Sequence, residues 1–447
     1  MDLTIGDWTF GHIRFTGPNE VAASAFDVDG ALADSARFAV GSIDHLGSRR
    51  GVVVPERSIA LDQLLAFCTT HVEVDGAAVP AWADLSGVYV TAGGRHLQIH
   101  CNFPHHARGV VDRLRCPPDR ASVAAAIAER DAFELEAELI DDGMIGAAVR
   151  TLDEWDEHPH ALATRALPLM SVDAIGDATA RPVESLSDDD GPLAGLRVVD
   201  CSRVLAGPVA GQMLAGFGAD VLRVGADHLP SVDVGVMSTG FGKRNTSIDL
   251  RTESGRSSFE SLLGEADVWI DAYRPGALAS CGFTPERVAR IRPGIVVVQI
   301  SAFDWIGPWA GRRGFDSIVQ STTGIRWAGG QFARDADGVP SGSPIGLPVQ
   351  ALDYATGLLG AGLVARLVAH QRDVGGSWLG RTSLLRTRDH LVARRAPTAF
   401  TPASVPVDPE FLGTVESEFG RLTAVLPFAG TWPSPPRRLG TSTPTWR

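Results

Sequence analysis

The chain has 447 residues, of which 44% are hydrophobic and 21% charged, and its formal net charge at pH 7 is −13. This length and composition predict a globular protein with two or three domains and at least one large core. The acidic balance argues against general binding to nucleic acid or to an anionic membrane surface, so we expect neither as a partner. An anionic ligand would need a local cluster of basic side chains or of backbone amides.

The sequence shows no pattern of export or membrane insertion. No segment reaches the roughly 18 consecutive apolar residues of a membrane-spanning helix, and the start MDLTIGDWTFGHIRFTG lacks the features of a signal peptide. The cysteines have no paired spacing, which favours free thiols in a reducing compartment. They are Cys68, Cys101, Cys116, Cys201 and Cys281. We therefore expect a cytoplasmic protein.

Residues 1–175 are expected to form a smaller α+β domain. Within them, GAAVPAWADLSGVYVTAGGRHLQIHCNF (76–103) predicts a hairpin that turns at Ala92-Gly93-Gly94. Helices are expected at 121–143 and at 144–155. The following stretch, 171–192, is acidic, rich in small residues and nonperiodic, and we place a linker at 176–190.

Residues 191–392 alternate between strand and helix patterns. Short apolar runs favour strands at 196–202, 221–225, 267–273 and 295–301, and helices are expected at 212–220, 257–266, 284–291 and 355–370. This alternation predicts an α/β fold with a doubly wound, parallel, Rossmann-like sheet beside the smaller α+β domain. The small-residue turn AGPVAG after the first strand lacks G-x-G-x-x-G, so dinucleotide binding is only weakly indicated. Residues 393–447 are expected to be a tail that returns to the core.

One carboxylate occupies a conspicuous position in PVQALDYATG (348–357). Asp353 precedes a helix of small and apolar residues. The simplest role is a helix N-cap, in which the side chain accepts hydrogen bonds from the first-turn amides. The alternative is a nucleophile held at the mouth of the helix. The residues alone leave both roles open.

Histidines gather in RHLQIHCNFPHH, at positions 96, 100, 105 and 106, next to Cys101. Their spacing matches no recurrent metal-binding motif, so we expect no metal and assign them structural or surface roles, with substrate contact as the alternative.

Basic residues follow or flank the expected strand ends between 196 and 301. They are Arg223, Lys243 (the only lysine of the chain), Arg244 and Arg274. Ligands bind at the carboxyl edge of a doubly wound sheet, so together these side chains form a candidate anion site. Each one alone is better explained as a solvated charge.

Five stretches, taken in order, resemble the family III CoA-transferases, the carnitine, bile-acid and formyl-CoA type. They are GPLAGLRVVDCSRVLAGPVAGQMLAGFGADVLRV (191–224), GKRNTSIDL (242–250), ADVWIDAYRPGAL (266–278), ISAFDWIGPWAGRRGFDSIVQSTTG (300–324) and ALDYATG (351–357). The resemblance implies an acyl-CoA donor, a carboxylic acid acceptor, no tightly bound cofactor beyond the CoA thioester substrate, and a homodimer.

The resemblance also assigns roles to individual residues. Asp353 falls on the family's nucleophile, which acts through an aspartyl anhydride and an aspartyl-CoA thioester. With an ordinary pKa of about 3.9 its carboxyl is ionised at neutral pH and needs no general base. The positions that match CoA-binding residues are Val204, Leu205, Ala206, Arg223, Lys243, Arg244, Tyr273 and Arg274.

Some residues depart from the family pattern. Leu205 stands in place of a glutamine and Ala272 in place of an asparagine, while Gly314-Phe315-Asp316 lacks the histidine that related racemases use. The alternatives to a transferase are therefore an isomerase that moves CoA within one molecule and an inert subunit that binds CoA or a partner chain.

The order of the domains is also unusual for the family, because the part that resembles its small domain comes first. The layout of residues 26–65 resembles that of 351–390, and a shift of 325 positions places Val28 opposite Asp353. We therefore expect a fused or permuted double unit with a truncated first copy.

Overall fold

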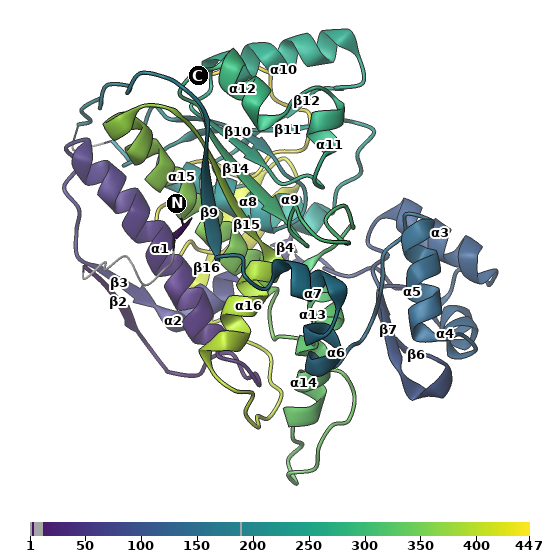
Figure 1. The fold of residues 1–447 in the computed structure, drawn as a ribbon. Helices are drawn as coiled ribbons and strands as arrows, with labels where there is room; N and C mark the ends of the chain where they lie inside the picture. Colours follow the sequence, from purple (N-terminus) through teal and green to yellow (C-terminus); the bar gives the residue numbers. More distant parts are fainter. Residues whose placement is uncertain (1, 4–11, 188–189) are drawn as a thin grey trace.

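A computed structural model describes residues 2–3, 12–187 and 190–447 (Figure 1). Its largest sheet has the strand order β1-β9-β15-β14-β13-β10-β11-β12. The strands from β15 to β12 in this order are mutually parallel, whereas β9 and β1 add to one edge in antiparallel orientation. The bounds of the parallel strands are β10 (Arg197–Cys201), β11 (Asp220–Gly225), β12 (Arg244–Ser247), β13 (Val268–Asp271), β14 (Val296–Ser301) and β15 (Ser377–Ser383).

The expected strands between 196 and 301 are confirmed. Counted along the chain, the six parallel strands lie in the order 3-2-1-4-5-6 across the sheet. The sheet as a whole is mixed, because β9 (Met170–Gly176) pairs antiparallel with β15, and β1 (Asp2–Leu3) pairs with β9. Residues 171–176, the start of the stretch that we interpreted as nonperiodic, therefore belong to a strand. Their backbone pairing with β15 forms this strand, although their composition does not predict one.

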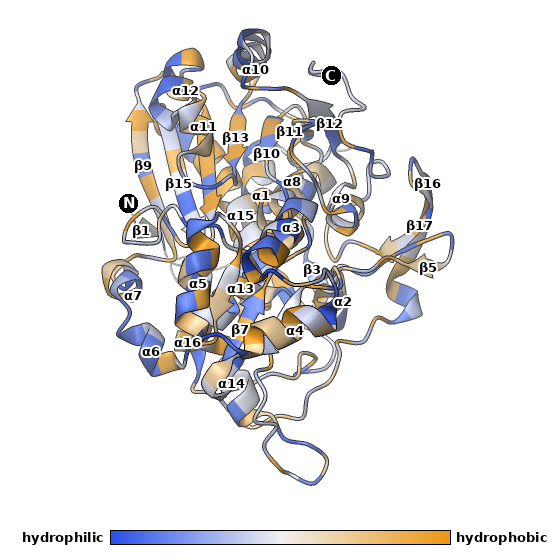
Figure 2. Cartoon of the chain, turned by 90° about the vertical axis from the view of Figure 1, so that its right-hand side faces the viewer, coloured by the Kyte–Doolittle hydropathy of each residue, from blue (hydrophilic) through white to orange (hydrophobic). Residues whose placement is uncertain are grey.

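Helices cover both faces of this sheet. One face packs against α8 (Ala206–Gly216) and α15 (Ala351–Val374), and the other against α10 (Glu253–Glu265) and α12 (Pro285–Ile291). The helix α1 (Val28–Arg49) packs in turn against α15. In β14, Val296 and Val298 belong to the first core and Val297 to the second. Strands buried on both faces have continuous apolar sequences, which Figure 2 shows as hydrophobic colouring at the centre of the sheet.

The helix after β10 begins earlier than expected. The residues AGPVAG, interpreted as a turn, form the first turns of α8. Pro208 is tolerated there because a first-turn residue has no intrahelical partner for its missing N–H. The remaining elements of this part are α9 (Asp233–Thr239), α11 (Ala277–Ser280), α13 (Asp316–Thr322), α14 (Ile325–Phe332) and α16 (Leu384–Arg394).

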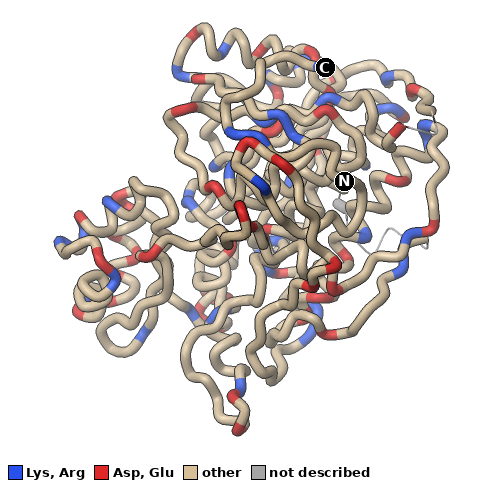
Figure 3. Tube along the Cα trace, turned by 180° about the vertical axis from the view of Figure 1, so that it is seen from behind, with Lys and Arg blue, Asp and Glu red and all other residues tan. Residues whose placement is uncertain are grey.

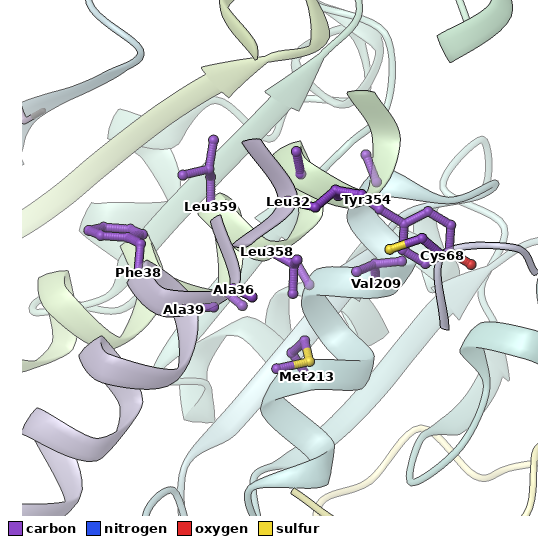
Figure 4. Packing of buried hydrophobic residues seen from close by; sticks show 14 of the residues in the cluster. Leu32, Ala36, Phe38, Ala39, Cys68, Val209, Met213, Tyr354, Leu358 and Leu359 are labelled. Carbon is purple, nitrogen blue, oxygen red and sulfur yellow. The ribbon is translucent and has the colours of Figure 1, made fainter. Parts of the chain in front are cut away.

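The helix α15 is the centre of the main core. Leu358 and Leu359 of α15 pack near Ala36 and Phe38 of α1, and a Cβ added to Gly362 would lie 2.5 Å from the Phe38 ring (Figure 4). By length and apolar composition α15 resembles a membrane-spanning helix, but 94% of its most apolar window is buried inside the protein, as in the core helix of a globular protein.

A smaller lobe stands to one side of the main body (Figure 1). It contains β6 (Gly87–Val90), β7 (His96–Ile99), β8 (Gly146–Ala148), α3 (Pro104–Leu114), α4 (Arg120–Ala128) and α5 (Ala132–Asp141). The hairpin with its turn at Ala92–Gly94 is confirmed. The helix expected at 144–155 is wrong in its first half, because residues 146–148 pair with β7 as an edge strand.

Contacts cross the expected boundary at residue 175. The helix α1 and the strand β9 pack with the second half of the chain, and β4 (Val72–Val74) pairs with β17 (Gly420–Val425) of the C-terminal tail. Thus only part of residues 1–175 forms the small lobe. The elements of the chain that remain to be named lie outside the small lobe. They are β2 (Ile13–Thr16), β3 (Arg57–Ala60), α2 (Leu61–Phe67), β5 (Ala77–Ala78), α6 (Leu152–Asp156), α7 (Pro159–Thr164) and β16 (Leu412–Ser417).

Candidate functional site

A pocket of about 740 Å³ lies over the carboxyl ends of the parallel strands, where open α/β sheets bind ligands. Each of the six strands contributes a residue at or just beyond its end: Cys201, Gly225, Ile248, Ala272, Ser301 and Leu384. The small lobe supplies the opposite wall with the residues Phe103–His106, Arg108 and Ile145. The pocket is therefore built by both halves of the chain.

Asp353 lines this pocket from the first turn of α15. The N-cap of that helix is Gln350, so the interpretation of Asp353 as an N-cap is wrong. The capping carboxylate comes instead from Asp316, the first residue of α13. Its Oδ2 accepts the backbone N–H of Asp353 at 2.9 Å, and it also accepts that of Leu352. The side chain of Asp353 is thereby left to face the pocket.

A glycine one turn further along α15 explains how Asp353 meets α8. Residues four apart lie on the same face of a helix, and Gly357 is four residues after Asp353. A Cβ on Gly357 would lie 2.5 Å from the carbonyl oxygen of Ala206. Glycine therefore lets the two helices approach closely, and the backbone N–H of Ala206 donates to the Asp353 carboxyl. The positive end of the α8 dipole thus faces this group.

The pKa of the Asp353 carboxyl is not the ordinary value that the sequence predicted. Burial raises the pKa of Asp353 well above its usual value, the neighbouring Asp316 carboxyl raises it further, and the Ala206 N–H opposes both effects. Burial also raises the pKa of Asp316 to about 6, although this carboxyl accepts two backbone amides and the Gln320 side chain. Two buried carboxyls that share a site disfavour simultaneous ionisation.

Replacement of Asp316 by asparagine is expected to move the acid limb of kcat/KM to lower pH. The substitution removes the negative charge beside Asp353, so the pKa of Asp353 falls and its carboxylate forms at lower pH. The pH-rate profile of the wild type and of Asp316→Asn measures this directly. A limb that stays in place, or moves to higher pH, would show that Asp316 does not control the ionisation of Asp353.

Of the residues expected to contact CoA at the loop after β10, three line the pocket, whereas Arg223 supports the loop from behind. Val204, Leu205 and Ala206 line the pocket. Arg223 does not, because its buried guanidinium donates to the carbonyl oxygens of Ser202 at 3.1 Å and Arg203 at 3.3 Å. Arg223 thus holds the backbone of this loop rather than facing a ligand.

Lys243 and Arg244 also lie outside the pocket lining. Lys243 is buried, and its Nζ donates to Asp200 Oδ2 at 3.2 Å and to the carbonyl oxygen of Pro208 at 3.0 Å. Arg244 pairs with Asp220 at 2.9 Å and donates to the C-terminal tail. Both cations are neutralised by aspartates of the central strands, so neither is placed to bind a phosphate.

Comparison with known proteins gives the family of this site. Residues 193–409 match the family model described as CoA-transferase family III, and this segment contains Asp353 and the strands beneath the pocket. We call residues 193–409 the family III segment after this match. The second wall of the pocket, from Phe103 to Arg108, lies outside the family III segment.

Relatives of the family III segment come from fungi and bacteria. An acetyl-coenzyme A transferase, nodX, of Hypoxylon pulicicidum is 34% identical over 191 residues, 42% of this chain and 31% of its own length. A succinate–glutarate CoA-transferase of Agrobacterium fabrum is 32% identical over 197 residues, 40% of this chain and 47% of its own. The chain therefore spans less than half the length of these two curated relatives. A crystal structure of a CAIB/BAIF family protein from Brucella suis has 25% identity and a TM-score of 0.41, and covers 52% of this chain and 65% of its own.

Arginines dominate the charged lining of the pocket. Tyr273 and Arg274 line it as expected, and five further arginines do so: Arg108, Arg203, Arg251, Arg312 and Arg313. The acidic lining residues are Asp353 and Asp249, and Asp249 pairs with Arg251 at 2.7 Å. Charges of both signs are mixed along the rest of the trace (Figure 3). The pocket is thus a local basic site in an acidic protein, which suits an anionic ligand.

The sequence indicates only weakly that these five further arginines line the pocket. Arg203 directly precedes the Val204–Ala206 loop, and Arg312 and Arg313 directly precede Gly314-Phe315-Asp316 of the family III pattern. Arg108 carries no local signal, since it reaches the pocket through the placement of the small lobe. No group of three or more histidine, cysteine or acidic residues is arranged to hold a metal ion within residues 2–3, 12–187 and 190–447.

Proposed function

We propose that the protein is an acyl-CoA:carboxylate CoA-transferase with Asp353 as its nucleophile. The observation that carries this proposal is the Asp353 carboxyl, which faces a basic pocket at the carboxyl edge of the sheet instead of capping its own helix. The family III match and relatives named as CoA-transferases support the same activity.

The reaction proceeds through two exchanges at one carboxyl group. The ionised Asp353 attacks the thioester carbonyl of the acyl-CoA, the C–S bond breaks, and an acyl-aspartyl anhydride and CoA thiolate form. The thiolate then attacks the aspartyl carbonyl, which releases the acyl group as a free carboxylate and leaves an aspartyl-CoA thioester. The acceptor carboxylate then attacks the aspartyl-CoA thioester, which forms an acceptor-aspartyl anhydride and releases CoA thiolate. The thiolate attacks the acceptor carbonyl of this anhydride, so acceptor-CoA leaves and the Asp353 carboxylate is restored.

Backbone amides at the start of α8 support the charge that develops in these steps. The Ala206 N–H already donates to Asp353, and donors fixed at a helix N-terminus stabilise an oxyanion without reorganisation. The order 3-2-1-4-5-6 of the parallel strands is that of a Rossmann-like unit. The arginines at the pocket lining suit the phosphates of CoA.

Mass spectrometry of the protein after incubation with an acyl-CoA tests the proposal. A CoA adduct is expected on the peptide that contains Asp353, and hydroxylamine should remove it because a thioester is sensitive to that nucleophile. The peptide with Asp316 serves as the internal control and should stay unmodified. Binding of CoA without any adduct would instead indicate the inert subunit, and the proposal would then be abandoned.

A further inference from the structure

The loop between β14 and α13 supplies a large part of the pocket wall. Residues 302–315 form no helix or strand, yet Ala302 and residues 312–315 line the pocket. The loop leads directly into Asp316, whose carboxylate accepts the backbone N–H of Asp353. A loop has no ladder of backbone hydrogen bonds of its own, so groups from other elements have to hold it in place.

One histidine from the first half of the chain holds this loop at two points. His160, in α7, is 0% exposed. Its Nδ1 accepts the backbone N–H of Trp309 at 3.1 Å, and its Nε2 lies 2.8 Å from the carbonyl oxygen of Phe303. Because Nδ1 accepts, the proton of the neutral ring is on Nε2 and is donated to that carbonyl. The imidazole therefore joins two separate backbone groups of the loop.

The surroundings of His160 favour the neutral ring that these two bonds require. Burial lowers the pKa of His160, and although the Phe303 carbonyl and Asp304 oppose this effect, Arg312 adds to it. Gly307 lets the loop come close to the imidazole, because a Cβ at this position would lie 2.7 Å from Nδ1 of His160. The ring and the loop are thus in direct contact.

The two points differ in what else holds them. At the first, Asp304 is 1% exposed, and its carboxylate accepts hydrogen bonds from Ser383 and from Arg386, each at 3.0 Å. At the second, the backbone N–H of Trp309 donates to His160, and a backbone amide has only one hydrogen to donate. The bond from Trp309 to Nδ1 is therefore the one that the loop most depends on.

Trp309 connects this bond to the pocket. The backbone N–H of Arg312 donates to the Trp309 carbonyl oxygen at 2.9 Å, and the Arg312 guanidinium lies 4.0 Å from the centroid of the Trp309 ring, a cation–π contact. Arg312 lines the pocket, and so does its neighbour Arg313. The position of Trp309 thus determines where both arginines enter the pocket wall.

We propose that His160 is a positioning residue, which fixes the 302–315 loop in the shape that lines the pocket and thereby sets the affinity for CoA. This inference rests on the proposed CoA-transferase function. His160 lies outside both the pocket lining and the family III segment, so the first half of the chain acts on the site from a distance. A displacement of about 1 Å in a group that positions a substrate is enough to impair an enzyme.

Calorimetric titration of the full chain with CoA alone tests the proposal without turnover. His160→Phe keeps a ring but removes both hydrogen bonds, and it is expected to raise the Kd for CoA about 10-fold. His160→Asn, whose amide oxygen can take the place of Nδ1, should bind CoA nearly as tightly as the wild type. His160→Gln, whose amide nitrogen can take the place of Nε2, should bind more weakly than His160→Asn, because it leaves the Trp309 amide unpaired.

A residue of the same helix gives the control for a purely structural loss. Thr164 is 3% exposed, and its Oγ1 donates to the backbone carbonyl of His160 at 2.9 Å. Thr164→Val should lower the melting temperature and leave the Kd unchanged, because partial unfolding reduces the number of binding sites and not their affinity.

The comparison of His160→Asn with His160→Gln decides the matter even where His160→Phe does not fold. Equal Kd values for the Asn and Gln variants, or an unchanged Kd in a folded His160→Phe, overturns the positioning role. A Kd that rises as much in Thr164→Val also overturns it. Failure of the wild-type protein to bind CoA overturns the proposed function itself.

Discussion

Replacement of Asp353 by asparagine is expected to lower the rate of CoA transfer by at least about 10³-fold, as the loss of an enzymic nucleophile does. The amide nitrogen takes the place of an oxygen, so neither the anhydride nor the aspartyl-CoA thioester can form. The fold should persist, because the N-terminus of α15 is capped by Asp316 and not by Asp353. The affinity for CoA should change little, since in the proposed mechanism the removed carboxyl reacts with the thioester and does not hold the nucleotide.

Initial rates with a panel of acyl-CoA donors and free acids measure the effect. The chain offers a matched control in Asp29, a buried aspartate in the first turn of α1. Its carboxylate accepts the backbone amides of Val21 at 2.5 Å and Ala22 at 2.9 Å, and it lies outside the pocket lining. Asp29→Asn should therefore keep the transfer rate. If Asp353→Asn exchanges CoA as fast as the wild type, the mechanism fails.

The sequence was sufficient to place Asp353 and the strands around it, but not to describe its environment. The apolar runs identify strands buried on both faces, and the ALDYATG stretch identifies the helix. The cap of that helix comes from Asp316, 37 residues earlier in the chain. Burial raises the pKa of Asp353, and the distant Asp316 carboxyl raises it further, so the expected ordinary value could not be corrected from local sequence.

The basic residues show a second limit. Arg223, Lys243 and Arg244 were expected near strand ends, where ligand contacts are common. In the structure Arg223 lies within β11, and Lys243 and Arg244 lie at the amino end of β12. Each donates to a partner inside the protein. Which cations are neutralised depends on the strand order, which brings Asp200 and Asp220 beside them. Residue type and spacing therefore predicted a basic site, and the fold decided which arginines form it.

The first half of the chain shows what a resemblance in layout can predict. The succession α1, β3, α2 repeats the succession α15, β15, α16, and α1 packs directly against α15 (Figure 4). The residue opposite Asp353 is Val28, and its neighbour Asp29 is bound to backbone amides. A permuted double unit stays a prediction. The described part of the first half supplies a wall of the pocket.

The junction of the two halves depends on one buried carboxylate. Glu136 of α5 is 3% exposed and accepts hydrogen bonds from Arg150 of the small lobe at 3.0 Å and from Arg312 of the family III segment at 3.0 Å. It also accepts the backbone N–H of Ala148 at 3.2 Å. Burial raises the pKa of Glu136, but the two guanidinium groups more than offset this effect and hold it below its usual value. The carboxylate is therefore the charged partner that both arginines require.

Glu136→Ala is expected to lower the free energy of unfolding by about 3–5 kcal/mol, the range for a buried ion pair that loses one partner. Two buried arginines would lose their common counter-ion, and the small lobe would be held less firmly against the pocket. Urea denaturation measures the change. Glu138, two residues further along α5, provides the control, because its pair with Arg130 at 2.6 Å is partly exposed, so Glu138→Ala should cost less than about 1 kcal/mol. Equal losses for the two variants would show that Glu136 is not the link between the halves.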